Sequence, residues 1–337
     1  AAWCGARCRC GVRGSIAGFQ VAAVAAALAE PGSRQLRSWQ ARAYSTGKRS
    51  HTRVTGVQRR ADADSESTAQ RFQTLSRDGF VHIPGAVSAD TSRILLDLLW
   101  EDYNQRHGVS RTDPLGWSTS KGQDMRLYGP LPQALKRSPQ FETLTTRLHV
   151  LGDEIFGLGS WRLKSKATVF VNWSSPGRSW TMPTGWHMDV SVEPAAVAPT
   201  FVYAFAFLDH AEPFGGNTLL LSGSTRRLRM MGEAMRKGGR LLKETLALED
   251  ERFARLFALP EDSEHHANEA DTELLMEQGI VSAGISMRVV ELRGAPSDLL
   301  LWDPRSLHSA SSNVSGRPRS VIRFRLELSG ASPYGVW

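Results

Sequence analysis

Apolar residues recur at helical spacing in three stretches of the first half of the chain. The first covers residues 71–77, and the second follows a helix-capping residue at Ser88 or Asp90. The third covers residues 141–156. A stripe of this kind is typical of a helix that buries one face. We therefore expect helices at these three places, and a loop-rich region over residues 103–140, where Pro and Gly are frequent.

Nine short stretches have strand character, as alternating apolar and polar residues or as short apolar runs. Turn-forming residues separate many of them, which is typical of an antiparallel β protein. With helices near 68–102 and 141–156, they predict a mainly β fold. The expected fold is a jelly roll, whose two sheets enclose a pocket, with helices packed on the major sheet. The nine stretches are residues 80–84, 161–166, 167–173, 185–190, 201–208, 218–221, 289–292, 298–302 and 321–328.

The pattern becomes helical again between residues 225 and 280. Apolar residues from Leu228 to Met235 have helical spacing, a Gly-Gly pair interrupts them, and residues 241–257 resume the pattern. Residues 261–273 are acidic and polar and are expected to form an exposed loop. Because strands precede and follow this stretch, we predict a helical insertion over about 225–280.

Residues 1–66 differ in composition from the rest and are expected to form a targeting segment or disordered linker before a catalytic domain at 67–337. They are rich in Arg and Ala, with a single acidic residue, Glu30, before residue 61. This composition favours a mitochondrial leader, with a plastid or other organellar leader as the alternative. The formal net charge of +7 comes from this segment, so the body gives no indication of nucleic-acid binding. No stretch is long and apolar enough to predict stable membrane insertion.

All three cysteines, Cys4, Cys8 and Cys10, lie in that segment. The body therefore has no thiolate for a disulfide, an iron–sulfur cluster or a cysteine zinc site. A metal ion there must take nitrogen and oxygen ligands. The candidates are iron, manganese, copper, or zinc held by imidazole and carboxylate.

His187 and Asp189 are two positions apart in a stretch with strand character. Side chains at i and i+2 point to the same face of a strand, so these two can hold one metal ion. His308, 121 residues later, supplies a second imidazole. Two imidazoles and one carboxylate form the facial triad of non-haem Fe(II) oxygenases. A hydrogen-bonded structural role for His187, and the His-x-Glu pair His210/Glu212 in a turn, are the alternatives.

Arg319 follows His308 by 11 residues, at the expected start of the next strand. A guanidinium there can return beside the metal and bind a carboxylate through two parallel hydrogen bonds. This arrangement suits 2-oxoglutarate, with its 2-oxo acid end on the metal and Asn172 as a further contact. Arg317 and Arg323 are rival candidates, and a surface role for Arg319 is the other interpretation.

Four motifs together resemble the phytanoyl-CoA dioxygenase family over about residues 70–330. The resemblance implies Fe(II), 2-oxoglutarate and O₂ as cofactor and co-substrates, with His187, Asp189 and His308 on the metal and Arg319 on 2-oxoglutarate. It also implies a double-stranded β-helix fold, and hydroxylation of a small organic or acyl substrate with release of succinate and CO₂. The motifs are Asp78-Gly79-Phe80 with Gly85, Trp186-His187-Met188-Asp189, Glu212 to Leu219 with Ser222-Gly223-Ser224, and Asp298 to His308 followed by Arg319.

Two features depart from the family pattern. Thr225 stands where the family usually has a histidine that is not an iron ligand, and the insertion is long. Asp189 is retained, whereas related halogenases carry a small residue there, so hydroxylation is favoured over halogenation.

The substrate is less well indicated. Basic residues over 225–243 can attract an anionic substrate such as an acyl-CoA or a carboxylate, or can form a solvated helix face. Trp173, Trp180, Trp186 and Trp302 can line an apolar pocket or pack in the core. Two other functions stay open: a catalytically inactive jelly roll that binds a metabolite or partner, and a cupin-type metalloenzyme, which has no use for Arg319.

Overall fold

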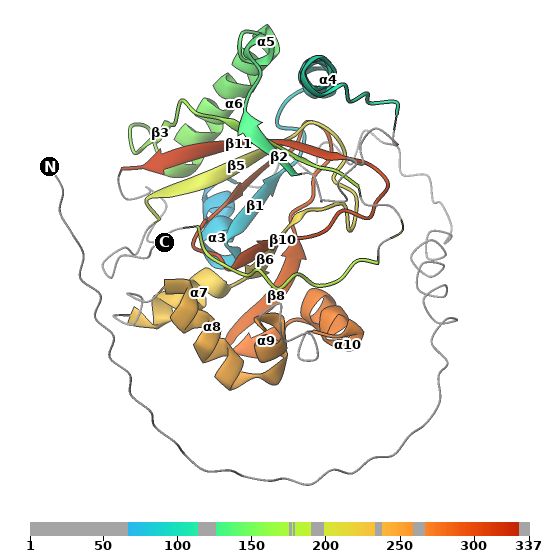
Figure 1. Cartoon of the computed structure of the whole chain (residues 1–337). Helices are drawn as coiled ribbons and strands as arrows, with labels where there is room; N and C mark the ends of the chain where they lie inside the picture. The colour runs from blue at the N-terminus through green and yellow to red at the C-terminus, as the bar shows by residue number, and fades with distance from the viewer. Residues whose placement is uncertain are drawn as a thin grey trace, which may run out of the picture. The chain divides into compact units, whose positions relative to one another are not determined.

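The strands form two antiparallel sheets in the computed structural model, of seven and four strands (Figure 1). The structure describes residues 67–113, 126–174, 177, 179–189, 199–232, 238–258 and 267–329. All of these belong to one compact unit that starts at Arg59. The strands are β1 (Phe80–Ile83), β2 (Arg126–Pro130), β3 (Trp161–Leu163), β4 (Thr168–Asn172), β5 (Phe201–Phe207), β6 (Thr218–Ser222), β7 (Ile280–Ser282), β8 (Ile285–Glu291), β9 (Leu299–Trp302), β10 (His308–Ala310) and β11 (Arg319–Leu328).

The chain crosses repeatedly between the two sheets. The large sheet has the order β1-β9-β5-β11-β4-β2, with β3 paired to β11, and the small sheet has the order β10-β6-β8-β7. From β5 onward the chain visits the large, small, large, small and large sheets in turn. This connectivity is a double-stranded β-helix, so the predicted fold class is confirmed.

Each sheet is covered by helices on its outer face (Figure 1). Serine side chains cap three of the helices over the large sheet, because Ser67, Ser88 and Ser138 each accept a hydrogen bond from a first-turn N–H group. The helices over the large sheet are α3 (Thr68–Asp78), α4 (Ala89–His107), α5 (Gln133–Lys136) and α6 (Pro139–Phe156). Those over the small sheet are α7 (Ser224–Met230), α8 (Gly238–Glu249), α9 (Glu251–Leu256), α10 (Glu269–Glu273) and the π-helix η4 (Leu274–Gln278).

Strand β5 shows how the sequence separates two layers of core. All seven of its residues are buried. Val202, Ala204 and Ala206 join the cluster beneath the helices, whereas its aromatic residues join a second cluster between the sheets. Alternation along the strand therefore places small residues against the helices and large rings in the interior. The inward rings are Phe201, Tyr203, Phe205 and Phe207.

Several sequence predictions were wrong in detail. Residues 185–189, the described part of the predicted strand at 185–190, do not form a strand, and His187 makes only an isolated bridge to His308. Strand β2 lies in the region that was expected to be loop. It is an edge strand of the large sheet, with no strand on its outer side, and an edge strand tolerates a proline such as Pro130, which has no N–H group to donate. The exposed loop predicted up to residue 273 contains α10, which starts with a capping box between Asn268 and Asp271.

The remaining predictions have mixed outcomes. The Gly-Gly pair lies at the start of α8. The predicted leader over 1–66 and Met235 lie outside the described residues. Within the described ranges, no helix is long and apolar enough to cross a bilayer.

Candidate metal centre

Two chain segments meet at the site through their backbones. His308 is the first residue of β10, and the N–H groups of His187 and His308 each donate to the other residue's carbonyl at 2.9 Å. Two residues on, the Asp189 N–H donates to the Pro304 carbonyl at 3.1 Å. These bonds hold the 187–189 segment against the segment that leads into β10, which places three side chains from distant parts of the sequence together.

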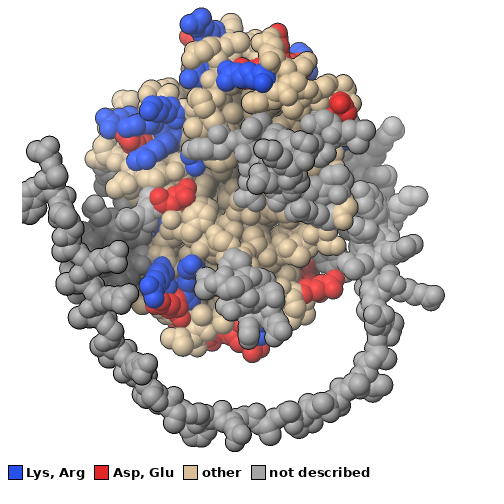
Figure 2. Space-filling view, viewed as in Figure 1, with Lys and Arg blue, Asp and Glu red and all other residues tan. Residues whose placement is uncertain are grey.

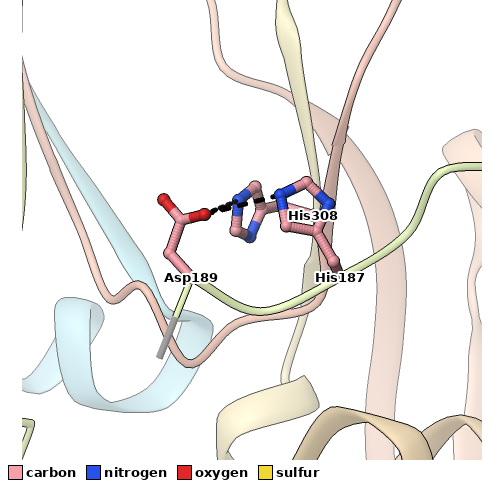
Figure 3. A group of neighbouring side chains, drawn as sticks. All are labelled: His187, Asp189 and His308. Carbon is pink, nitrogen blue, oxygen red and sulfur yellow. Dashed lines mark ion pairs between the residues drawn. The ribbon is translucent and has the colours of Figure 1, made fainter. Parts of the chain in front are cut away.

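The three side chains converge on one point (Figure 3). Asp189 Oδ1 lies 3.4 Å from His187 Nε2 and 3.6 Å from His308 Nε2. The two imidazole centroids are 4.4 Å apart, and one ligand atom from each residue lies within 4.8 Å of the others. Among the described residues, this is the one group of three or more His, Cys, Asp or Glu side chains close enough to hold a metal ion.

The histidines are held in the same way. His187 Nδ1 lies 2.8 Å from the Gly185 carbonyl, and His308 Nδ1 lies 2.9 Å from the Ser306 carbonyl. A carbonyl only accepts, so each Nδ1 carries the proton and donates. Both Nε2 lone pairs then point to the shared space beside Asp189 in the neutral imidazoles. Such a bond to the second ring nitrogen is the usual way in which proteins orient a metal-binding histidine.

The charges at this point favour a cation. Burial raises the pKa of Asp189, but hydrogen bonds and positive charge from the protonated forms of His187 and His308 outweigh burial, so its pKa is lowered and the carboxylate is ionised. The hydrogen bond to Asp189 raises the pKa of His187, and burial opposes this. The His187 side chain is 54% exposed and that of His308 is 6% exposed, so a buried ligand and an accessible one share the site.

Arg319 starts β11 and is buried at 6% exposure. Its Nη1 makes a long hydrogen bond of 3.4 Å to the Gly216 carbonyl, while Nε and Nη2 are buried without a hydrogen-bond partner among the described residues. Its guanidinium lies 5.4 Å from the centre of the Phe205 ring. Burial lowers the pKa of Arg319 to about 10, with Glu291 opposing. A buried cation with unused donors is costly unless an anion completes it.

Asn172 lies directly opposite Arg319 across the β4–β11 pair. Its amide nitrogen donates to the carbonyls of Gly216 at 3.0 Å and Ser311 at 3.2 Å. Gly216 has a φ of +73°, and a Cβ there would lie 2.2 Å from the Asn172 amide nitrogen. Asn172 thus holds the Gly216 loop beneath Arg319. Its contact with a co-substrate stays a prediction.

The other residues considered from the sequence are not part of the group formed by His187, Asp189 and His308. His210 and Arg317 are exposed. Arg323 faces the interior, with Nη1 at 4.0 Å from Asp189 Oδ2. Of the four tryptophans, only Trp302 belongs to the cluster between the sheets, and its ring is 4.8 Å from that of His308. Trp173 and Trp186 pack in the two outer clusters, which is the core-packing alternative for these two residues.

The sequence analysis missed the support beneath His308. Asp303 and Arg305 are both buried, and Arg305 donates from Nε at 3.1 Å and from Nη2 at 2.7 Å to the two carboxylate oxygens. This ion pair braces the loop whose Pro304 and Ser306 carbonyls hold Asp189 and His308. The Asp-x-Arg spacing was the available signal.

No protein-family model matches the chain, and no curated protein matches it. Solved structures resemble it distantly. The structure of the non-heme alpha ketoglutarate dependent epimerase SnoN is 18% identical, with coverage of 80% of this chain and 86% of that one, at a TM-score of 0.43. AviO1 from Streptomyces viridochromogenes Tue57 is also 18% identical, with 80% and 98% covered, at 0.46. HygX from Streptomyces hygroscopicus, solved with nickel and 2-oxoglutarate bound, is 14% identical, with 77% and 87% covered, at 0.44. Membership of the phytanoyl-CoA dioxygenase family therefore stays a prediction.

Proposed function

We propose that this protein is a Fe(II)- and 2-oxoglutarate-dependent dioxygenase that hydroxylates a small molecule. The observation that carries the proposal is a two-histidine, one-carboxylate group in the same interior as a buried arginine with unused donors. The three-residue group fits the metal ion that such an enzyme needs, and the arginine fits its co-substrate, 2-oxoglutarate.

The donor set fits a divalent metal with open positions. Two neutral imidazoles and one carboxylate from one side leave the remaining positions of an octahedral ion for other ligands, as in the non-haem Fe(II) oxygenases. The orientation of both rings by backbone carbonyls fits ligation through Nε2. When bound, Fe(II) would supply the activation of O₂ that a protein side chain lacks.

The buried arginine fits a carboxylate. Arg319 and Arg323 are four positions apart on β11, so both face the interior, and Arg323 lies beside Asp189. The unused Nε and Nη2 of Arg319 form the edge of a guanidinium that binds a carboxylate through two parallel bonds. The distal carboxylate of 2-oxoglutarate supplies this partner, while its 2-oxo acid end reaches toward the metal residues.

The overall reaction is balanced by these components. Substrate C–H, O₂ and 2-oxoglutarate give substrate C–OH, succinate and CO₂, with one oxygen atom in each of the alcohol and the new carboxylate. The protein's own contribution is to hold the ligands and the co-substrate in fixed positions within a largely apolar interior.

The decisive experiment measures binding and turnover separately. Under argon, calorimetry should show Fe(II) binding to the protein and 2-oxoglutarate binding to the Fe(II)-loaded protein. Admission of O₂ should then release succinate slowly even without the substrate. His187→Ala should lose Fe(II) affinity and succinate release, whereas His210→Ala, which changes an exposed histidine, should keep both.

Each alternative function predicts a different result. A binding protein without turnover would take up Fe(II) and 2-oxoglutarate but release no succinate. A cupin-type metalloenzyme would bind the metal but not 2-oxoglutarate. Folded protein that binds neither would overturn the proposal.

A further inference from the structure

The interior between the sheets holds a second residue with an unused buried donor, besides Arg319. Trp302 is 2% exposed, and its Nε1–H group is buried without a hydrogen-bond partner among the described residues. The surface differs, because basic and acidic side chains lie beside one another on the face shown in Figure 2, and Arg162 pairs with Glu327 at 2.7 Å. A buried tryptophan usually donates its N–H to an acceptor, so the Trp302 N–H needs an explanation.

Two tryptophans outside this interior show the usual arrangement. Trp161 Nε1 donates to Asp153 Oδ1 at 2.9 Å, and Trp186 Nε1 donates to the Pro183 carbonyl at 2.7 Å. Both of these rings pack in the outer clusters, where the chain itself supplies the acceptor. At Trp302 the acceptor has to come from water or from a ligand.

Water is the less suitable of these two acceptors. An ordered buried water needs about three polar partners of its own. The rings that pack against Trp302 are those of Tyr203 at 5.0 Å, Phe205 at 5.6 Å and His308 at 4.8 Å between centroids. These neighbours are aromatic, and the His308 Nδ1 proton already goes to the Ser306 carbonyl. The surroundings therefore favour a ligand as the acceptor.

The position of Trp302 indicates which ligand this is. Its ring packs edge-on against that of His308, which belongs to the metal-binding group. It also neighbours Phe205, and the same Phe205 ring lies 5.4 Å from the guanidinium carbon of Arg319. Phe205 is thus a common neighbour of the two residues with unused donors. A molecule that extends from Arg319 across this ring to the metal residues ends beside Trp302.

2-Oxoglutarate has the chemistry to meet both donors. Its distal carboxylate is the proposed partner of Arg319. At its other end, chelation of a metal ion uses the 2-oxo oxygen and one carboxylate oxygen. The remaining carboxylate oxygen keeps its lone pairs and needs a donor when it is buried. The neutral indole N–H satisfies that oxygen without placing another charge beside the metal ion.

We propose that the indole N–H of Trp302 donates a hydrogen bond to the non-chelating carboxylate oxygen at the 2-oxo acid end of 2-oxoglutarate. This inference rests on the proposed function, because it assigns a further residue to the same co-substrate. Trp302 and Arg319 then hold the co-substrate at opposite ends, which favours a single orientation. Trp302 is a binding residue in this arrangement and supplies no ligand to the metal.

Packing against His308 alone does not account for Trp302. A phenylalanine ring packs on an imidazole as well, and it brings no donor that is costly to bury. Leu300, two residues earlier on the same face of β9, is apolar and joins the same cluster. The test must therefore remove the N–H group and keep a ring.

The experiment compares the wild type with Trp302→Phe, as the full chain loaded with Fe(II) under argon. Calorimetry should show the Kd of 2-oxoglutarate rising about 10- to 100-fold in the variant, as expected for the loss of a hydrogen bond to a charged group. The Kd of Fe(II) alone should stay near the wild-type value. At saturating 2-oxoglutarate, the absorption band that Fe(II) forms with a bound 2-oxo acid should move, because the lost bond acts on that end.

Two control variants separate this effect from others. Trp161→Phe removes an N–H that donates to Asp153 outside the interior, and it should keep both the Kd and the band. Arg319→Lys should weaken 2-oxoglutarate binding at the opposite end, but the band should keep its position once the protein is saturated.

A measurement on the wild type makes the test independent of how the phenylalanine variant folds. In isotope-labelled full chain loaded with Zn(II), the indole proton resonance of Trp302 should move to higher frequency when 2-oxoglutarate binds. The resonance of Trp161 should stay in place. Absence of the signal from Trp302→Phe or from Trp302→Tyr assigns it.

The outcomes are distinguishable. The inference is overturned if Trp302→Phe keeps the wild-type Kd, or if the Trp302 resonance stays in place when 2-oxoglutarate binds. A weaker Kd with an unmoved band also contradicts it, since Trp302 would then act through packing. A wild type that binds no Fe(II), or binds Fe(II) but no 2-oxoglutarate, contradicts the proposed function instead.

Discussion

Arg305 and Arg319 are both buried, at 3% and 6% exposure, but they end in opposite situations. Arg305 grips both carboxylate oxygens of Asp303, which is also buried. Arg319 has one long hydrogen bond, and two of its nitrogens are without a partner among the described residues. The two arginines are therefore similarly buried, and they differ in whether a buried carboxylate pairs with the guanidinium. The first arginine completes a structural pair, while the second keeps buried donors that a carboxylate could accept from.

The two arginines also differ in how they are connected to the metal-binding residues. The Asp303–Arg305 loop supplies the Pro304 and Ser306 carbonyls that orient Asp189 and His308. Arg319 instead donates its one hydrogen bond among the described residues to the Gly216 carbonyl, and its other donors lie in the interior. Substitutions in the first region should therefore change stability, and substitutions in the second should change ligand affinity.

The largest expected effect comes from Arg305→Met. It leaves the Asp303 carboxylate buried without its guanidinium, and breaking a buried pair in this way costs about 3–5 kcal/mol. Urea unfolding should show the loss in the free energy of unfolding. The double variant Asp303→Asn/Arg305→Met removes the buried charge and should recover part of the loss. An unchanged unfolding midpoint for Arg305→Met would show that the pair is not the brace described above.

The next largest effect is expected from Arg319→Met, and it should appear in affinity. Removing one partner of a buried charge pair costs about 2 kcal/mol or more, so the Kd of 2-oxoglutarate should rise about 30-fold or more. Without ligand, the free energy of unfolding should stay the same or increase, because a poorly satisfied buried cation is removed.

Calorimetry and urea unfolding on the same preparation separate these two effects. Arg317→Met, which changes an exposed arginine two residues earlier, is the matched control and should keep wild-type affinity. A ligand-free Arg319→Met protein that loses as much stability as Arg305→Met would remove the distinction between the two regions.

Alternation and spacing were enough to predict most of the fold and the meeting of His187, Asp189 and His308. The all-buried run at β5 and the start of β11 at Arg319 followed directly from residue type. The described part of the strand predicted at residues 185–190 is not a strand, yet His187 and Asp189 still face the same point. Two reciprocal bonds to His308 hold the backbone extended at His187, which is enough to preserve the i, i+2 relation without a full strand.

Partners distant in sequence could not be predicted. The pattern of tryptophans does not tell which ring faces the interior, and only pairing in the sheet places Trp302 there and Trp173 elsewhere. The unused donors of Arg319 depend on what surrounds it from β5 and from the loop at Gly216. The sequence indicated a cation at this place, and the three-dimensional structure adds that its neighbours leave it unsatisfied.

The smallest expected effect concerns Glu291, whose charge acts on Arg319 from a distance. Burial raises the pKa of Glu291, although its carboxylate accepts from the Phe214 N–H at 2.9 Å and from Asn217 Nδ2 at 3.0 Å. The folded protein thus holds this proton to a higher pH than the unfolded chain. Its contribution to stability is full below the ordinary pKa of 4.5 and is lost as the pH rises through the raised value.

Glu291→Gln should therefore raise the free energy of unfolding at neutral pH by about 1 kcal/mol or less, since the amide oxygen keeps both hydrogen bonds. The gain should disappear well below pH 4.5, where the glutamate is itself largely protonated in both states. Urea unfolding at the two pH values measures it. If the variant is less stable at neutral pH, Glu291 is acting as the counter-ion of Arg319. Arg319 would then be a paired residue like Arg305, without the need for a ligand.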